Sequence, residues 1–172
     1  MSDITKQSLT ELVENIKNKK LSSTEVTKAF IDRSETSKEL NAYITEDFTS
    51  ALNKAKKFDQ KPNLDLKLPG VPMAVKDLFC TKDVKTTAGS KILNNFVPTY
   101  ESTVTDNIWK EGAILLGKLN CDEFAMGSSN ETSFFGNVQN PIDKDLVPGG
   151  SSGGSASAVA GQLTPITIGT DT

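Results

Sequence analysis

The chain has 172 residues, 36% of them hydrophobic, and a formal net charge of −3, which suits one domain with a buried core. The slightly acidic balance gives no sign of a nucleic-acid-binding face. The sequence contains no histidine, so a Ser-His-Asp or Cys-His site cannot be assembled from these residues. A hydroxyl nucleophile would need another base, and lysine is the established alternative.

The cysteines and the N-terminal residues predict a cytoplasmic location. Cys80 and Cys121 are widely spaced and have no histidine or metal-ligand neighbour, which is typical of reduced structural thiols. Residues 1–6 lack the apolar run of a signal peptide, and no segment approaches the length of a membrane span. We therefore expect no contact with a membrane.

Residues 1–60 are predicted to form an N-terminal helical layer. Apolar residues recur at the spacing of one buried helix face: Leu9, Leu12, Val13 and Ile16. Ser22 and Glu25 form a capping box that starts a second helix, and Ala51 to Phe58 predicts a shorter third helix. Nothing in this region suggests chemistry, so we interpret it as a scaffold or docking layer.

Residues 61–172 are predicted to be the first part of an α/β domain. Val71–Val75, Ala113–Leu116 and Pro165–Ile168 are short apolar runs that read as strands. Ser102 is a candidate N-cap for a helix that runs to about Glu111. Strands that alternate with helices predict a layered α/β fold, in which loops at strand ends are the usual place for a site.

The most informative segment is the glycine- and serine-rich run Gly149–Ser155. Glycines suit a tight turn or a close approach, and N–H groups at the start of the predicted Ala-rich helix would stabilise a negative charge. Composition alone favours a flexible linker, but the run is short and lies between Pro148 and a helix. A phosphate loop would need a Lys-Ser/Thr pair where Ala156 and Ser157 stand. We therefore favour a catalytic loop.

Lys76 is the candidate base. It ends an apolar strand and precedes Asp77, so its side chain can be drawn out of water. Desolvation lowers the pKa of a lysine, and a neutral lysine is a competent general base. On this residue alone, a surface lysine that ends a strand is an equally good interpretation.

Four segments, taken together and in this order, resemble the amidase-signature family: Val75–Asp77, Met126–Glu131, Pro148–Ala156 and Gly169–Thr172. The resemblance extends from the N-terminal helices to the last residue. Within the family, Met126–Phe135 and the general N-terminal pattern are similar to the A subunits of glutamyl-tRNA(Gln)/aspartyl-tRNA(Asn) amidotransferases. The resemblance implies a layered α/β/α fold with a mixed sheet and N-terminal helices, incomplete at the C-terminus.

The resemblance also implies a Ser-Ser-Lys triad in place of Ser-His-Asp. The family lysine matches Lys76, and the bridging serine, which the family holds on a cis peptide, matches Ser151. The nucleophilic serine belongs three positions past Thr172 and is absent from this sequence. Backbone N–H groups around Thr172 would stabilise the oxyanion.

Other residues near the triad have expected roles of a different kind. Met126, Gly127 and Ser128 are expected in the wall of a glutamine pocket and in the hydrogen bonds that orient the lysine, although without the resemblance they read as an ordinary Gly/Ser turn. Ser152 and Ser155 are expected to bond backbone or to cap the helix. The neighbouring acids of Cys121–Glu123 are not expected to hold a metal.

The implied function is that of a glutaminase subunit. It would supply ammonia to a B subunit, which uses ATP and magnesium to activate mischarged glutamyl-tRNA(Gln), while a small C subunit clamps the two. This chain would itself bind no cofactor. Two alternatives stay open: a stand-alone amidase of the same family, and a non-catalytic interaction module, since a triad without its nucleophile cannot turn over.

Overall fold

The computed structural model describes residues 3–171. Its four strands form one mixed sheet in the order β1-β3-β2-β4. The strands are β1 (Tyr43–Glu46), β2 (Pro72–Lys76), β3 (Ile114–Leu119) and β4 (Thr167–Ile168). Strand β2 is parallel to both β3 and β4, whereas β1 runs antiparallel to β3.

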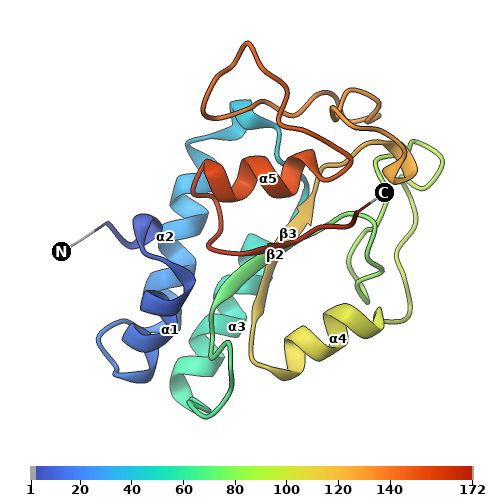
Figure 1. The fold of residues 1–172 in the computed structure, drawn as a ribbon. Helices are drawn as coiled ribbons and strands as arrows, with labels where there is room; N and C mark the ends of the chain where they lie inside the picture. The colour runs from blue at the N-terminus through green and yellow to red at the C-terminus, as the bar shows by residue number, and fades with distance from the viewer. Residues whose placement is uncertain (1–2, 172) are drawn as a thin grey trace.

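Five α-helices of the described part of the chain surround this sheet (Figure 1). They are α1 (Leu9–Lys17), α2 (Ser23–Glu35), α3 (Phe48–Gln60), α4 (Thr103–Lys110) and α5 (Gly153–Ala160). Short 3-10 turns lie at Ile4–Lys6, Lys38–Leu40 and Glu123–Ala125. The predicted helices are therefore confirmed, as are the three strands predicted within residues 61–172, with shifts of a few residues at their ends.

Side-chain caps explain where three of the helices begin. Ser22 accepts a hydrogen bond from the Glu25 N–H while the Glu25 carboxylate accepts one from the Ser22 N–H, which confirms the predicted capping box of α2. Ser8 starts α1 with the same arrangement. The Ser102 hydroxyl accepts from the Thr105 N–H, and this confirms Ser102 as the N-cap of α4.

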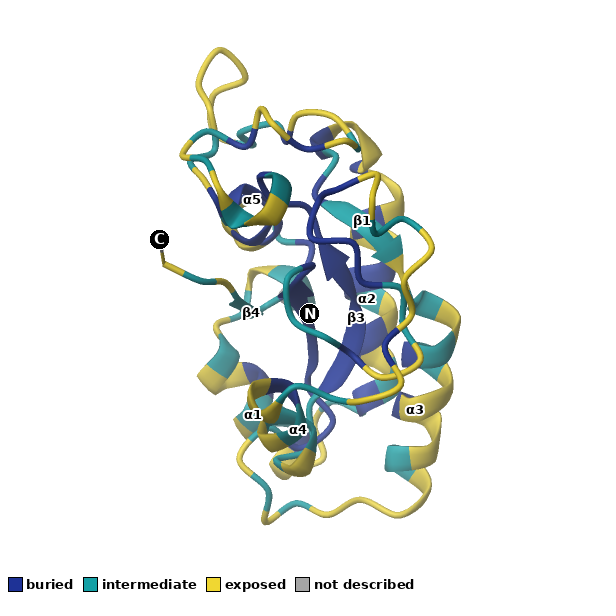
Figure 2. Ribbon diagram, turned by 90° about the vertical axis from the view of Figure 1, so that its right-hand side faces the viewer, coloured by how far each residue is buried: buried dark blue, intermediate teal, exposed yellow. Residues whose placement is uncertain are grey.

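The sheet has a different apolar cluster on each face. The cluster that includes Ala74 and Leu116 packs against side chains of α1, α2, α3 and α5. The cluster of Met73, Val75 and Leu115 packs against residues of α4. Alternate strand residues point to opposite faces, so this division follows from the strand sequence and gives the expected layered α/β/α arrangement. Strands β2 and β3 are buried along their whole length, and Figure 2 shows β3 in dark blue at the centre of the molecule.

The first 60 residues contain a strand that the sequence pattern did not predict. Strand β1 pairs with β3, opposite Gly117–Leu119. Its four residues are too few to show a period, and its pairing joins segments that are distant in the chain. Residues 1–60 therefore contribute an edge strand as well as helices. The division at residue 60 stays a prediction.

The glycine run also differs from the expectation, because helix α5 begins inside it. Gly153 and Gly154 lie in the first turn of α5 rather than before it. A Cβ atom on Gly154 would lie 2.4 Å from the Asn120 carbonyl oxygen, and one on Gly153 would lie 2.5 Å from the Asn130 side chain. The glycines let the helix start against the backbone at the end of β3.

Candidate active site

The Lys76 side chain lies at the carboxyl end of β2 and is fully buried. Its Nζ atom is 2.6 Å from Ser151 Oγ, 3.0 Å from Ser152 Oγ and 2.7 Å from Thr170 Oγ1. Ser151 and Ser152 precede α5, and Thr170 follows β4. The ends of two parallel neighbouring strands and the start of a helix therefore bring three hydroxyls to one amine.

Burial makes the Lys76 amine a stronger candidate for a base. Loss of water lowers the pKa of Lys76, while the charges of Cys121 and Asp122 act in the opposite direction. Burial also raises the pKa of the Cys121 thiol to about 12, so this thiol is neutral at pH 7. At neutral pH the opposing charge is therefore that of Asp122.

The Gly150–Ser151 peptide is cis, as the family resemblance implied for the bridging serine. The Asp122 N–H donates to the Ser151 carbonyl oxygen at 3.1 Å, which ties this peptide to the segment after β3. A Cβ atom on Gly150 would lie 2.3 Å from Asp122 Oδ2. The loop therefore needs glycine at position 150 in order to approach the carboxylate.

A comparison with family models places the chain in a family. The model of the family described as "Amidase" matches residues 25–172. The chain belongs to the amidase family.

Individual amidase-family relatives agree with this assignment. The chain is 84% identical, over all 172 residues, to the A subunit of the glutamyl-tRNA(Gln) amidotransferase of Pelagibacter ubique (strain HTCC1062), of which it covers 36%. It is therefore similar to about one third of that relative, the N-terminal part. The structure of the corresponding A subunit of Thermotoga maritima matches 95% of the chain at 31% identity, with a TM-score of 0.75 and 34% of that structure covered. The structure of a fatty acid amide hydrolase matches 99% of the chain at 26% identity, with a TM-score of 0.90 and 32% covered.

The structure brings Lys76 and Ser151 together. The other residues expected at this amidase-family site, Met126, Gly127 and Ser128, make no side-chain hydrogen bond with Lys76 in the described part of the chain. Gly127 packs on the Asp122 carboxylate, and the backbone of Ser128 lies beside Gly150. The Met126 side chain is 72% exposed. Within residues 3–171, the hydroxyls that contact Lys76 come from outside this segment. Thr172 lies outside the described residues.

Ser152 and Ser155 contact backbone, as expected, and Ser152 stands at the N-cap position of α5 without a cap hydrogen bond from its side chain. The Ser152 hydroxyl accepts from the Thr170 N–H at 3.1 Å and lies 3.0 Å from the Thr170 carbonyl oxygen, to which it donates. The Ser155 hydroxyl is 3.4 Å from the Ile168 carbonyl oxygen. The additional contact of Ser152 with Lys76 was not predicted, because a run of alternating glycines and serines gives no sign of which hydroxyl faces the lysine.

Two further residues near the lysine were missed by sequence reasoning. Thr170 was noticed only as part of a motif, although its place directly after a short apolar run is a signal for a strand-end residue. Asp122 is fully buried, and its side chain accepts hydrogen bonds from the backbone of Asn130 and from Thr132. The sequence did not show that Asp122 is buried and Glu123 is not, because adjacent acidic residues are normally both solvated.

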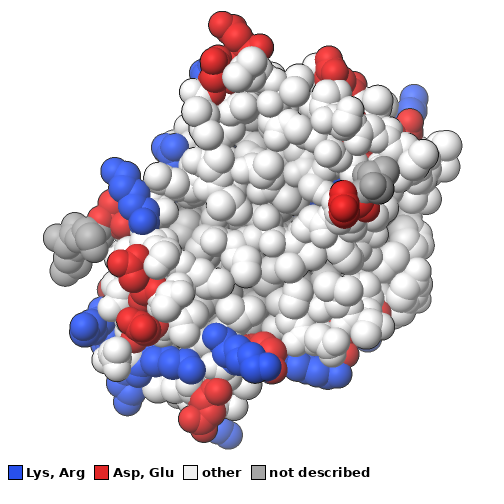
Figure 3. Space-filling model, in the orientation of Figure 1, with Lys and Arg blue, Asp and Glu red and all other residues white. Residues whose placement is uncertain are grey.

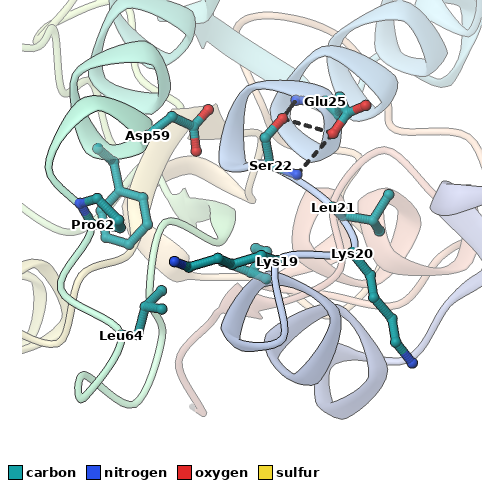
Figure 4. Close-up of a pocket in the computed structure, with 10 residues that line it drawn as sticks. Lys19, Lys20, Leu21, Ser22, Glu25, Asp59, Pro62 and Leu64 are labelled. Atoms are coloured by element: carbon teal, nitrogen blue, oxygen red, sulfur yellow. Dashed lines mark hydrogen bonds between the residues drawn. The ribbon is translucent and has the colours of Figure 1, made fainter.

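A separate surface pocket of about 440 Å³ lies between α1, α2 and the end of α3 (Figure 4). Both of its carboxylates already accept hydrogen bonds: Asp59 from the N–H groups of Ser23 and Thr24, both at 2.9 Å, and Glu25 from the N–H and hydroxyl of Ser22, both at 2.8 Å. Lys19 and Lys20 line the same pocket. Among residues 3–171, no group of three metal-ligating side chains is found, and no helix has the length and apolar character to cross a membrane.

Proposed function

We propose that this chain supplies the base and the bridging hydroxyl of a Ser-Ser-Lys site in a glutamine-hydrolysing amidotransferase subunit. The observation that carries the proposal is the buried contact of 2.6 Å between Lys76 Nζ and Ser151 Oγ. An amine without water around it and beside a hydroxyl can take the place of an imidazole.

The reaction begins with a proton relay. Neutral Lys76 accepts the proton of the Ser151 hydroxyl, and Ser151 accepts the proton of a nucleophilic serine, which we place three positions past Thr172. The nucleophile attacks the side-chain amide carbon of glutamine, and a new C–O bond forms as the carbonyl becomes an oxyanion. The C–N bond then breaks. The proton held by Lys76 returns through Ser151 to the leaving nitrogen, and ammonia departs from the acyl-enzyme.

Water completes the cycle by the same relay. It gives a proton toward Lys76 as it attacks the acyl carbon, and the proton returns to the serine when glutamate leaves. N–H groups around Thr172 would stabilise both oxyanions. Removal of one such donor from an enzyme typically costs about 3 kcal/mol of transition-state stabilisation. Met126, Gly127 and Ser128 would form part of the wall that holds glutamine.

The amidotransferase assignment is supported by the 84% identity to the A subunit of such an enzyme. In the complex, ammonia passes to a B subunit that uses ATP and magnesium to activate glutamyl-tRNA(Gln), and a small C subunit completes the assembly. Aspartyl-tRNA(Asn) is a second acceptor of the same chemistry. The surface in the view of Figure 3 fits this division, because most of its charged side chains lie toward the margin and include both signs. We place the protein in the cytoplasm.

Glutaminase assays of the polypeptide encoded by the complete reading frame test the proposal. Lys76→Ala and Ser151→Ala are each expected to lower kcat/KM by about 10²- to 10⁴-fold, the contribution usual for acid–base groups. Lys110→Ala is the matched control, because Lys110 is an exposed lysine at the end of α4. Full activity of Lys76→Ala, or a reading frame without a serine three positions past Thr172, would contradict the proposal.

A stand-alone amidase is the second candidate, and the TM-score of 0.90 with a fatty acid amide hydrolase favours it. The relay would be the same and the amide would differ. Comparison of kcat/KM for glutamine and for a long-chain fatty amide separates the two functions. A preference for the fatty amide would reject the amidotransferase and retain the Ser-Ser-Lys site. The 172-residue chain alone is expected to hydrolyse neither amide.

A further inference from the structure

Asp122 stands out among the acidic residues because it is fully buried and has no cation in contact with it among the interactions of residues 3–171. Its charge is held by hydrogen bonds. Oδ2 accepts from the Asn130 N–H at 3.0 Å, and Oδ1 accepts from Thr132 Oγ1 at 2.8 Å and from the Thr132 N–H at 3.3 Å. A buried charge of this kind is costly to maintain, and this points to a specific role.

The backbone closes over this carboxylate from two directions. A Cβ atom on Gly127 would lie 2.3 Å from Asp122 Cγ, and one on Gly150 would lie 2.3 Å from Oδ2. The backbone N–H of Asp122 also donates to the Ser151 carbonyl oxygen. Asp122 therefore joins the segment 127–132 to the peptide that presents the Ser151 hydroxyl.

We propose that Asp122 is a positioning residue that holds Ser151 against Lys76 and supplies the negative charge that accompanies the Lys76 ammonium during the relay. This inference rests on the proposed function. When Lys76 accepts a proton, its direct partners are hydroxyls, which carry no charge. The nearby carboxylate offsets the new positive charge through space, as the aspartate of a Ser-His-Asp triad does for its imidazolium.

The other ionisable groups around Lys76 do not provide this charge. The Cys121 thiol is neutral at pH 7, since burial raises its pKa to about 12. Asp77 is paired with Lys118 at 3.3 Å, and the two charges offset each other. Asp171 is exposed, so solvent and salt screen its charge more than that of a buried carboxylate, and the residues of α5 and β4 are not ionisable. Among the described residues, Asp122 is therefore the buried acidic group without a cationic partner that acts on the Lys76 charge.

The decisive experiment replaces Asp122 with asparagine in the polypeptide encoded by the complete reading frame. Removal of the negative charge makes the Lys76 ammonium less stable, so its pKa falls. The acidic limb of the pH profile of kcat/KM is therefore expected to move to lower pH by about one unit. Activity at the optimum is expected to fall at least about tenfold, because the asparagine amide cannot accept all three hydrogen bonds.

Thr132→Val is the matched variant that keeps the charge. It removes the hydroxyl that donates to Asp122 Oδ1, so we expect lower kcat and faster hydrogen exchange at the Asn130 and Ser151 amides, with the acidic limb unchanged. If Asp122→Asn lowers activity while the limb stays in place, the charge role is wrong. If Thr132→Val alters neither kcat nor exchange, the positioning role is wrong, and this variant decides alone should Asp122→Asn fail to fold.

A direct titration separates this inference from the proposed function. The Lys76 signal in protein labelled with [13Cε]lysine is assigned by its loss in Lys76→Met, and its midpoint is compared between wild type and Asp122→Asn. A lower midpoint in Asp122→Asn supports the charge role even if glutamine proves not to be the substrate. An unchanged midpoint overturns it even if glutamine is hydrolysed.

Discussion

Two fully buried lysines lie on adjacent strands of the sheet, and the groups that contact them differ in kind. Lys118 on β3 lies 3.3 Å from the Asp77 carboxylate and also donates to the Phe79 carbonyl and the Thr86 hydroxyl, both at 2.7 Å. Lys76 on β2 contacts hydroxyls and is more distant from a carboxylate. Burial lowers the pKa of both lysines, but Asp77 opposes the effect directly at Lys118.

One sheet therefore holds two buried lysines in different surroundings: Lys118 is paired with a carboxylate, and Lys76 is the lysine that we propose as the base. Lys118 and Asp77 stabilise each other's charge. Burial raises the pKa of Asp77, and the Lys118 charge lowers it. Lys76 is surrounded by groups that can exchange protons with it. The difference lies in the contacting groups rather than in the depth of burial.

The largest expected effect is that of Lys118→Met, which leaves the Asp77 carboxylate buried without its cation. We expect the free energy of unfolding to fall by about 3–5 kcal/mol. Urea unfolding, followed through the fluorescence of the single tryptophan, Trp109, measures it. The double variant Asp77→Asn/Lys118→Met should recover much of the loss. Equal stability of Lys118→Met and wild type would contradict the view that Lys118, unlike Lys76, is held by a buried ion pair.

Thr86→Val is expected to have the next largest effect, because it removes a hydroxyl from the charged Lys118. A hydrogen bond to a charged group contributes about 1.5–3 kcal/mol, and we expect a loss of stability in this range. Thr170→Val, the matched variant at Lys76, should cost about 1 kcal/mol if Lys76 is neutral as we propose, since a bond between neutral groups is weaker. Chemical denaturation of both variants under one condition tests the comparison. Equal losses would argue that Lys76 is as fully charged as Lys118.

A smaller effect is expected in the pH dependence of stability. The pKa of Lys76 is lower in the folded chain than the ordinary lysine value, so the unfolded state binds more protons between these two values. The contribution of Lys76 to the free energy of unfolding therefore rises with pH up to about 10.4. The total rise is about 1.4 kcal/mol for each unit by which folding lowers the pKa of Lys76. The difference in unfolding free energy between wild type and Lys76→Met should rise from pH 7 to pH 10. Subtraction removes the contributions of Cys121 and Tyr43, whose burial raises their pKa values and acts in the opposite direction.

The smallest expected effect lies far from both lysines and serves as a reference. Ser22→Ala removes the hydroxyl that caps α2 and should cost about 1 kcal/mol of stability. Thermal unfolding measures the loss, and the pH profile of activity should be unchanged. A shifted profile in Ser22→Ala would show that general destabilisation alone alters the site, which would weaken every comparison above.

Much of the fold could be predicted because the signals are local. The capping box at Ser22, the cap at Ser102 and the apolar runs around Val75 and Leu116 each depend on residues a few positions apart. Strand β1 could not be predicted in this way, since only its pairing with β3 makes it a strand. The start of α5 at Gly153 depends likewise on contacts with Asn120 and Asn130.

The candidate site likewise combines features that the local sequence predicts with features that depend on tertiary contacts. The sequence by itself determined that histidine is absent, that Lys76 ends an apolar strand, and that Ser151 lies in a glycine-rich turn before a helix. Only the tertiary structure decided that Thr170 and Ser152 also reach the amine and that Asp122, unlike its neighbour Glu123, is buried beneath two glycines. The physical reason is that desolvation and proton affinity depend on which distant segments pack around a group, and this information is not contained in any local pattern.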